Sequence, residues 1–231
     1  MTQLESVRWA RDVPVRYEAD VAVVGGGIAG ACAACAAAAR GARVILVERS
    51  AVAGGVLTSG GVGNWCGGVE GNGEVFDEIR THLAAFGALG PFRQDAHGQV
   101  TQVFDHELLA VVLQEMLLRR GVRLLLHTQF VDVRAAGGRI AECVVAGPSG
   151  PEALRARVFV DCTGEGLLAH RAGFATMKGR DSDGLTLPMS MMFFIREAPE
   201  PFAPQAPDGW FEPIRRKEDL PMHSFWPNGP G

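Results

Sequence analysis

Three glycines with the spacing G-x-G-x-x-G follow a short apolar run near the start of the chain. Gly25, Gly27 and Gly30 come directly after the strand-like residues 20–24 and before an alanine-rich stretch suited to a helix. The first glycine permits a tight turn, the second lets backbone approach a pyrophosphate, and the third allows close packing of helix on strand. A helix starting here offers free N–H groups to phosphates. The spacing predicts a dinucleotide site.

An acidic residue completes this unit. Glu48 follows the apolar residues 44–47, which predict a second strand, and Gly41 ends the intervening helix. A carboxylate at this point accepts hydrogen bonds from ribose hydroxyls and repels a 2′-phosphate, so NADP is disfavoured while NAD and FAD both fit. Residues 19–49 therefore predict a βαβ unit. The open alternatives are a unit of this shape that binds nothing, and a membrane helix over the uncharged residues 21–39, which the four glycines there disfavour.

The elements that must position these residues can be traced along the chain. The glycine-dense residues 54–73 favour an ordered loop close to a ligand over a flexible linker. Periodic apolar positions predict helices over 74–86 and 105–120, the second with Asp105 as N-cap and Gly121 as its end. A strand is expected over 122–128. Residues 130–134, 139–146 and 153–157 then alternate as an antiparallel meander, 158–161 form a buried strand, and 167–172 a short helix.

These elements predict an α/β protein with a Rossmann-like domain. We expect a lead-in over residues 1–18, a nucleotide-binding domain over 19–174 with its meander at 128–160, and the start of a substrate or cap domain over 175–231. Most of the 13 prolines lie in this last part, which shows no βαβ pattern. The chain ends without a closing strand or capping helix, so we expect an N-terminal portion of a longer protein.

Composition narrows the function classes. Hydrophobic residues make up 47% and charged residues 21% of the 231 residues, which is ordinary for an α/β protein of this size. The net charge of −4 argues against nucleic acid as a partner. The N-terminus lacks the apolar core of a signal peptide, and five cysteines without framework spacing fit a reducing cytoplasm. We expect a cytoplasmic protein without a membrane partner.

Four motifs resemble those of a known family. They are DVAVVGGGIAGACAACAAAARGARVILVER, AGGVLTSGG, VFVDCTGEGLLAHRAG and LPMSMMFFI. Together they are similar to the two-dinucleotide-binding-domain flavoproteins, and within them to the FAD-dependent oxidoreductases of the broad FAD_oxidored type. The resemblance covers roughly residues 12–231 and implies FAD as cofactor.

The resemblance also implies roles for single residues. Residues 25–30 would hold the pyrophosphate, Glu48 the adenosine ribose, and Arg49 would lie beside adenine. Residues 54–60 would follow the ribityl chain and flavin ring, with Thr58 and Ser59 as hydrogen-bond donors. Val131 would match a backbone position that recognises adenine. The implied cofactor-binding residues are Gly25, Gly26, Gly27, Ile28, Ala29, Gly30, Glu48, Arg49, Gly54, Gly55, Thr58, Ser59, Gly60, Val131, Thr163 and Gly164.

The turn at residues 162–166 departs from the family pattern. The family sequence is usually ATG-D-G, and here it reads CTGEG, with Cys162 and Glu165 in place of alanine and aspartate. The change is mild enough to keep the assignment of Thr163 and Gly164. It leaves no assigned role for Glu165.

Other reactive residues fit simpler interpretations. Cys32 and Cys35 have C-x-x-C spacing but lie among alanines of the predicted helix, which favours small core residues over a redox pair. Cys66 fits an inert loop cysteine, and Arg180 and Asp183 fit a solvated loop. No spacing suggests a metal site, and no histidine is assigned as a general base.

The sequence therefore predicts an FAD-dependent oxidoreductase that transfers hydride to or from a small-molecule substrate. Two alternatives stay open. One is a non-catalytic nucleotide-binding module or fragment that needs a partner chain or a C-terminal segment. The other is a flavin-dependent RNA-modifying protein, which would require a basic surface that the composition does not indicate.

Overall fold

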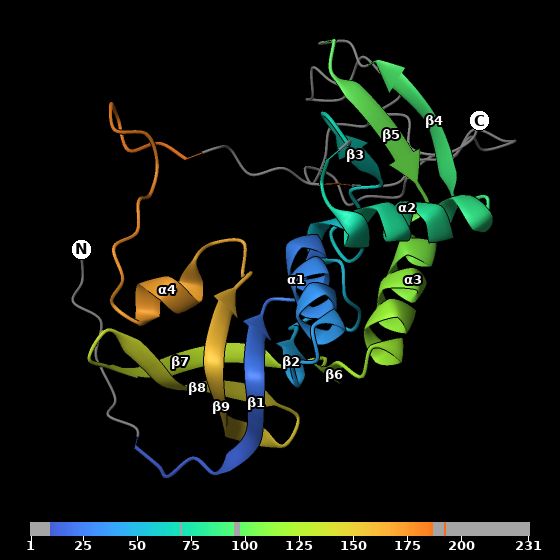
Figure 1. Cartoon of the computed structure of the whole chain (residues 1–231). Coiled ribbons are helices and arrows are strands. Elements are labelled where there is room, and N and C mark those ends of the chain that lie inside the picture. Colours follow the sequence, from blue (N-terminus) through green and yellow to red (C-terminus); the bar gives the residue numbers. More distant parts are fainter. Residues whose placement is uncertain (1–9, 70, 95–97, 187–191, 193–231) are drawn as a thin grey trace, which may run out of the picture.

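A mixed six-stranded sheet forms the centre of the protein (Figure 1). The computed structural model describes residues 10–69, 71–94, 98–186 and 192. The elements of the described residues are β1 (Val15–Val24), α1 (Ile28–Ala39), β2 (Val44–Val47), the 3-10 helix η1 (Gly55–Leu57), β3 (Asn64–Cys66), α2 (Glu74–Ala85), β4 (Leu89–Gln94), β5 (Val100–Phe104), α3 (His106–Arg119), β6 (Arg123–Leu125), β7 (Gln129–Ala136), β8 (Arg139–Gly147), β9 (Gly150–Asp161) and α4 (Leu167–Arg171).

The strand order confirms the predicted fold class. The order is β6-β2-β1-β9-β8-β7, with β6, β2, β1 and β9 parallel and β9, β8 and β7 antiparallel. The chain runs from β1 to β2 and β6 on one side, and β9 pairs with β1 on the other. The order therefore reverses between β1 and β9, where α/β proteins bind ligands.

Strand β9 corrects the expectation of two separate strands at 153–157 and 158–161. It is continuous, and it pairs in parallel with β1 from Ala153 to Asp161 and antiparallel with β8 from Gly150 to Arg155. No turn residue interrupts the sequence between the two expected strands. Strand β1 is also longer than expected and begins at Val15. The sequence did not predict this extension because residues 15–18 are not an apolar run. In the structure Arg16 and Tyr17 instead donate hydrogen bonds to Glu152.

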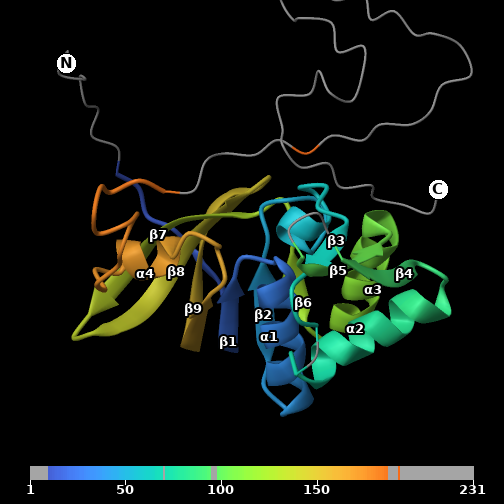
Figure 2. The same cartoon turned by 90° about the horizontal axis from the view of Figure 1, so that it is seen from above.

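A second sheet, with order β3-β5-β4, lies beside α2 and α3 (Figures 1 and 2). The sequence predicted only a loop at Pro91, whereas β4 includes this proline. Proline cannot donate to a strand ladder, and it is tolerated here because β4 is an edge strand. Trp65 on β3 packs against Phe76 and Phe104, with ring centroids 4.9 and 4.2 Å apart.

Helix α1 packs closely on the sheet because its residues are small. Gly30, Ala31, Ala34 and Cys35 form its buried side. The structure divides the uncharged residues 21–39 between the end of β1, a turn and α1, and so contradicts a membrane helix over that run. None of the helices in the described part of the chain has the length and apolar character needed to span a membrane.

The two longer helices after α1 match their predicted ranges closely. Helix α3 begins after Asp105, whose carboxylate accepts hydrogen bonds from the N–H groups of Glu107 (2.9 Å) and Leu108 (3.0 Å), as expected of an N-cap. The strand expected over 122–128 is shorter, since β6 spans only Arg123–Leu125. Most of the domain expected over 175–231, including nearly all of the LPMSMMFFI motif, lies outside the described residues.

Candidate functional site

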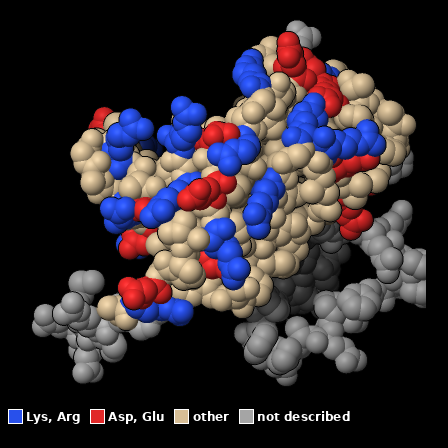
Figure 3. Space-filling model, turned by 60° about the horizontal axis from the view of Figure 1, so that its bottom comes forward, with Lys and Arg blue, Asp and Glu red and all other residues tan. Residues whose placement is uncertain are grey.

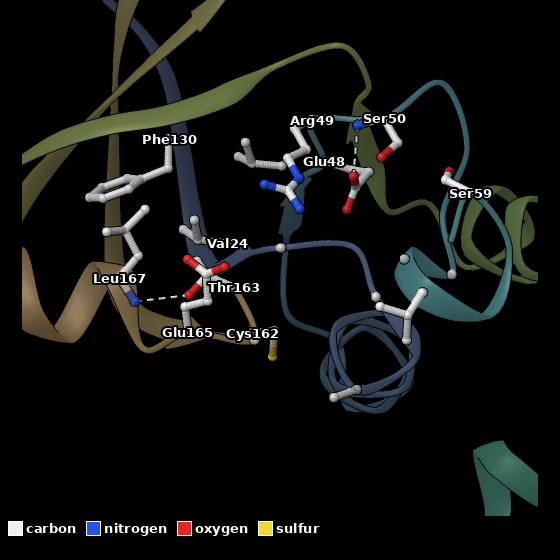
Figure 4. A pocket seen from close by; sticks show the side chains of 18 of the residues that line it. Val24, Glu48, Arg49, Ser50, Ser59, Phe130, Cys162, Thr163, Glu165 and Leu167 are labelled. Atoms are coloured by element: carbon white, nitrogen blue, oxygen red, sulfur yellow. Dashed lines mark hydrogen bonds between the residues drawn. The ribbon is translucent and has the colours of Figure 1, made fainter. Parts of the chain in front are cut away.

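A cavity of about 470 Å³ lies at the carboxyl ends of β1, β2 and β9. It lies where the strand order reverses, and its volume is typical of small-molecule sites. Figure 4 shows its side chains converging from the strand ends and from the loops that follow them. The lining residues are Val24, Gly25, Gly27, Ile28, Ala29, Val47, Glu48, Arg49, Ser50, Gly54, Gly55, Val56, Ser59, Gly60, Thr128, Gln129, Phe130, Cys162, Thr163, Gly164, Glu165 and Leu167.

Two of the three motif glycines are required by packing. Gly25 has a φ of +98°, and a Cβ there would lie 2.2 Å from the carbonyl oxygen of Cys162. A Cβ at Gly30 would lie 1.9 Å from the carbonyl oxygen of Gly25. Glycine at both positions lets the turn, α1 and the end of β9 meet. Gly30 does not line the cavity, and neither does Gly26.

The third motif glycine faces open space. Gly27 lines the cavity, and a Cβ there would have no atom within 4 Å. It immediately precedes α1, and no side chain caps that helix end. The first N–H groups of a helix lack partners within the helix. The arrangement leaves room for an anionic group against backbone N–H donors, as the glycine spacing predicts.

Glu48 follows β2 and is 5% exposed. Its Oε2 accepts the N–H of Gly26 at 2.7 Å, and its Oε1 accepts the N–H of Ser50 at 2.7 Å. The carboxylate therefore fixes the glycine turn and the start of the next loop. Each oxygen of an ionised carboxylate can accept a further hydrogen bond, so both can still bind ligand hydroxyls.

The loop at residues 54–60 forms the next wall of the cavity. The N–H of Gly54 donates to the carbonyl of Gly26 at 2.7 Å, which ties this loop to the glycine turn. Ser59 and Gly60 line the cavity, as do Gly54 and Gly55. Thr58 does not, because its side chain is buried and its hydroxyl donates to the carbonyl of Ala53 at 2.8 Å. Of the two expected hydroxyl donors, the structure places only Ser59 at the cavity.

The loop at residues 162–166 closes the opposite side. The N–H of Cys162 donates to the carbonyl of Val24 at 2.8 Å, and Thr163 and Gly164 line the cavity as expected. Glu165 also lines it. Figure 4 shows Arg49 and Glu165 reaching into the cavity from different sides. The lining therefore includes two acidic residues, Glu48 and Glu165, and a basic one, Arg49.

The structure does not bring Val131 to the cavity. Val131 is 44% exposed on β7, whereas the preceding residues Thr128, Gln129 and Phe130 form the lining. The cavity therefore meets β7 only at its start, at Gln129 and Phe130, and at the preceding Thr128. Sequence reasoning also assigned no role to Val24, Val47, Ser50 and Leu167, and it included Val56 only as part of residues 54–60. The sequence could have indicated Ser50 and Leu167, because Ser50 directly follows Glu48 and Arg49, and Leu167 directly follows the turn at residues 162–166.

The remaining candidate residues lie away from this chemistry. Cys32 and Cys35 are free thiols on α1, and burial raises the pKa of Cys32 to about 11 and that of Cys35 above its ordinary value. Burial likewise raises the pKa of Cys162, which, unlike these two, lines the cavity. Arg180 and Asp183 pair with each other in an exposed turn. Among the described residues, no group of three or more His, Cys, Asp or Glu side chains could hold a metal ion.

The parallel part of a mixed sheet, with two glycine turns at the point where the strand order reverses, defines a dinucleotide-binding fold. The model of the FAD dependent oxidoreductase family matches residues 20–225, and the chain belongs to that family. Its cofactor is FAD. Comparison with the curated proteins gave no match.

Solved structures show the same fold. The chain is similar to a geranylgeranyl bacteriochlorophyll reductase-like protein from Thermoplasma acidophilum (TM-score 0.51, 17% identity, 68% of this chain and 42% of that one). It is also similar to THI4 of Thermovibrio ammonificans (TM-score 0.51, 23% identity, 71% and 67%). A third is CabE, an aromatic hydroxylase from angucycline biosynthesis (TM-score 0.50, 26% identity, 68% and 33%). The chain thus spans less than half the length of the first and third of these proteins.

Proposed function

We propose that the protein is an FAD-dependent oxidoreductase that transfers hydride between flavin and a small-molecule substrate, with FAD held in the cavity described above. The observation that carries this proposal is the convergence of two glycine turns and Glu48 at the reversal point of the sheet. The family match supports the cofactor and reaction class. CabE, which is named as an aromatic hydroxylase, supports a small-molecule substrate.

The lining residues fit the parts of FAD. Gly27 and the first turn of α1 offer an open backbone surface for the pyrophosphate. The Glu48 carboxylate faces the cavity with free acceptor capacity for ribose hydroxyls. The loop at 54–60 offers mainly backbone and Ser59 to the remainder of the cofactor. Bound FAD supplies the hydride-accepting or hydride-donating ring, while the chain binds, orients and shields it.

We further propose that the FAD-binding domain extends to about residue 174 and starts at Val15, where β1 begins, rather than at residue 19 as expected from the sequence, and that the substrate domain begins near residue 175. All five cysteines are free, which supports a cytoplasmic location.

An experiment can distinguish the enzyme from the alternative, a non-catalytic nucleotide-binding module. A chain that binds FAD but shows no reduction of the flavin by any tested donor would favour that module over the enzyme.

The first test identifies the cofactor. The purified 231-residue chain is mixed with FAD, freed of excess ligand by gel filtration and examined by visible absorption, and the ligand released on denaturation is identified. Retained FAD supports the proposal. A chain that retains NAD but not FAD would overturn it.

A matched pair of glycine variants locates the site. A Cβ added at Gly27 or at Gly68 would meet open space, and neither residue has a positive φ, so alanine fits either position without strain. Only Gly27 of the two lines the cavity. We expect Gly27→Ala to weaken FAD binding at least about tenfold, since the methyl group keeps the ligand from the backbone. Gly68→Ala should bind FAD like the wild type. Equal affinity in both variants would contradict the assigned site.

A further inference from the structure

The end of β9 carries a carboxylate that does not line the cavity. Asp161 is the last residue of β9 and lies beside Val24, the last residue of β1. Its Oδ1 accepts the N–H of Thr163 at 3.0 Å and the hydroxyl of Thr163 at 2.7 Å. Its Oδ2 accepts the N–H of Ala169 at 2.9 Å. One side chain therefore joins the strand end, the 162–166 loop and α4.

The Thr163 hydroxyl extends this connection. Its proton goes to Asp161, and its oxygen accepts the N–H of Leu167 at 2.9 Å. A hydroxyl has one proton to donate, so none is left for a phosphate oxygen. The Thr163 hydroxyl thus makes its hydrogen bonds to Asp161 at the end of β9 and to Leu167 at the start of α4, although Thr163 lines the cavity (Figure 4).

The loop held in this way is the one that packs on the glycine turn. The carbonyl oxygen of Cys162 and the nitrogen of Thr163 would lie 2.2 and 2.8 Å from a Cβ at Gly25. Gly164 has a φ of +82° and Gly166 a φ of +64°, so the loop contains two residues with little conformational restraint of their own. Restraint must come from its neighbours, and Asp161 and Thr163 provide it.

We propose that Asp161 is a positioning residue for the cofactor. The Thr163 hydroxyl acts with it, through its hydrogen bonds to Asp161 and Leu167, and does not bind FAD. Together they hold the 162–166 loop in the conformation that presents Gly164 to the cavity. This inference rests on the proposed function. It assigns part of the affinity for FAD to two side-chain groups that make no bond to it.

The test measures FAD affinity and the thermal stability of the ligand-free chain for Asp161→Asn, Thr163→Val, the double variant and Thr163→Ser. In Asp161→Asn an amide NH₂ group can face the N–H of Ala169, and a charge-assisted hydrogen bond is lost. We expect each of the first two variants to weaken FAD binding about tenfold. The double variant should be little weaker than either single one. Thr163→Ser should bind FAD like the wild type.

Asp20→Asn is the matched control. Asp20 lies on the same sheet, outside the cavity lining, and accepts the backbone N–H of Arg43 at 3.0 Å. This variant should alter stability without altering FAD affinity.

Three outcomes would overturn the inference. In the first, Asp161→Asn lowers stability but leaves FAD affinity unchanged. In the second, the effects of Asp161→Asn and Thr163→Val multiply fully in the double variant, as they do for independent contacts. In the third, Asp161→Asn does not fold and Thr163→Val binds FAD like the wild type. Failure of the wild type to bind FAD would instead refute the proposed function.

Discussion

Single residues at the site divide into those that touch the ligand space and those that shape it. The sequence predicted Gly27, Glu48, Ser59 and Gly164 at the cavity, and the structure places them there. Gly27 and Glu48 follow from the spacing of the βαβ unit, because a turn after a parallel strand must reach the same edge of the sheet, whereas Ser59 and Gly164 were implied by the family resemblance. Which of two adjacent hydroxyls points inward depends on loop packing, which no short sequence pattern specifies. That is why Thr58 was expected at the cavity and is found buried.

Because Thr58 is buried and Ser59 lines the cavity, removing their hydroxyls should affect different properties, stability for Thr58 and FAD affinity for Ser59. The Thr58 hydroxyl donates to the Ala53 carbonyl inside the loop, so Thr58→Val should lower the free energy of unfolding by about 1 kcal/mol. Any loss of FAD affinity should then accompany that instability. Ser59→Ala should leave the unfolding free energy nearly unchanged and weaken FAD binding. Urea unfolding and FAD titration of both variants check this, and a Thr58→Val chain as stable as the wild type would contradict it.

Charge at the cavity gives a second residue-scale prediction. The FAD diphosphate is dianionic, and the lining carries Glu48 and Glu165 against Arg49. Removing the Glu165 charge should tighten FAD binding by roughly two- to fivefold at low salt, and the gain should shrink as salt screens it. Glu18→Gln, on an exposed part of β1, is the control for net charge. Weaker binding by Glu165→Gln would show instead that Glu165 holds the ligand directly.

At the scale of elements, periodic helices were predicted well and paired strands less so. Helices α2 and α3 follow from their own apolar spacing, since their pattern is local. The sheet β3-β5-β4 depends on pairing between Trp65 and Gln102, far apart in the chain, and could not be predicted from either segment. Strand β9 shows the same dependence. Its two halves look different in sequence because β8 covers only the first of them.

The meander carries an ionic contact with a predictable pH response. Glu142 on β8 accepts hydrogen bonds from Arg134 on β7 and Arg155 on β9, and those bonds hold its pKa below the ordinary value of 4.5. A lowered native-state pKa means stability that is full above pH 4.5 and is lost as the pH falls through the native value. Urea midpoints of wild type and Glu142→Gln should therefore differ at about pH 7 and converge well below the ordinary pKa of the carboxyl group. A constant difference would contradict this.

The whole molecule combines a charged exterior with a cavity joined to the strand ends. Acidic and basic side chains are interspersed over the face seen in Figure 3. In the proposed site, Glu48 binds the adenosine part of the ligand and the start of α1 binds the pyrophosphate. A ligand must therefore contain both adenosine and a pyrophosphate to make both contacts. The sequence predicted this binding plan but could not reveal the substrate side, which no local motif specifies.

This plan predicts which ligands stabilise the whole chain. FAD at about one hundred times its Kd adds about 2.7 kcal/mol to the free energy of unfolding, which corresponds to a rise in Tm of roughly 5 to 10 °C. FMN lacks the adenosine half and should raise Tm far less at the same concentration. NADP should have little effect, because its 2′-phosphate meets Glu48. A thermal scan with each ligand checks this ranking, and equal shifts from FMN and FAD would contradict the adenosine contacts.

The parallel pairing of β1 with β9 sets an order of events during synthesis. Val24 and Asp161 lie side by side, yet the ribosome makes them far apart in time, because α1 and most of the sheet come between them in the chain. The glycine turn leaves the ribosome well before the loop that packs on it at Cys162. A nascent chain that has not yet reached that loop lacks the side of the cavity that residues 162–165 form. Cofactor capture must therefore wait until nearly the whole sheet has been translated, and β1 stays without its β9 neighbour until then.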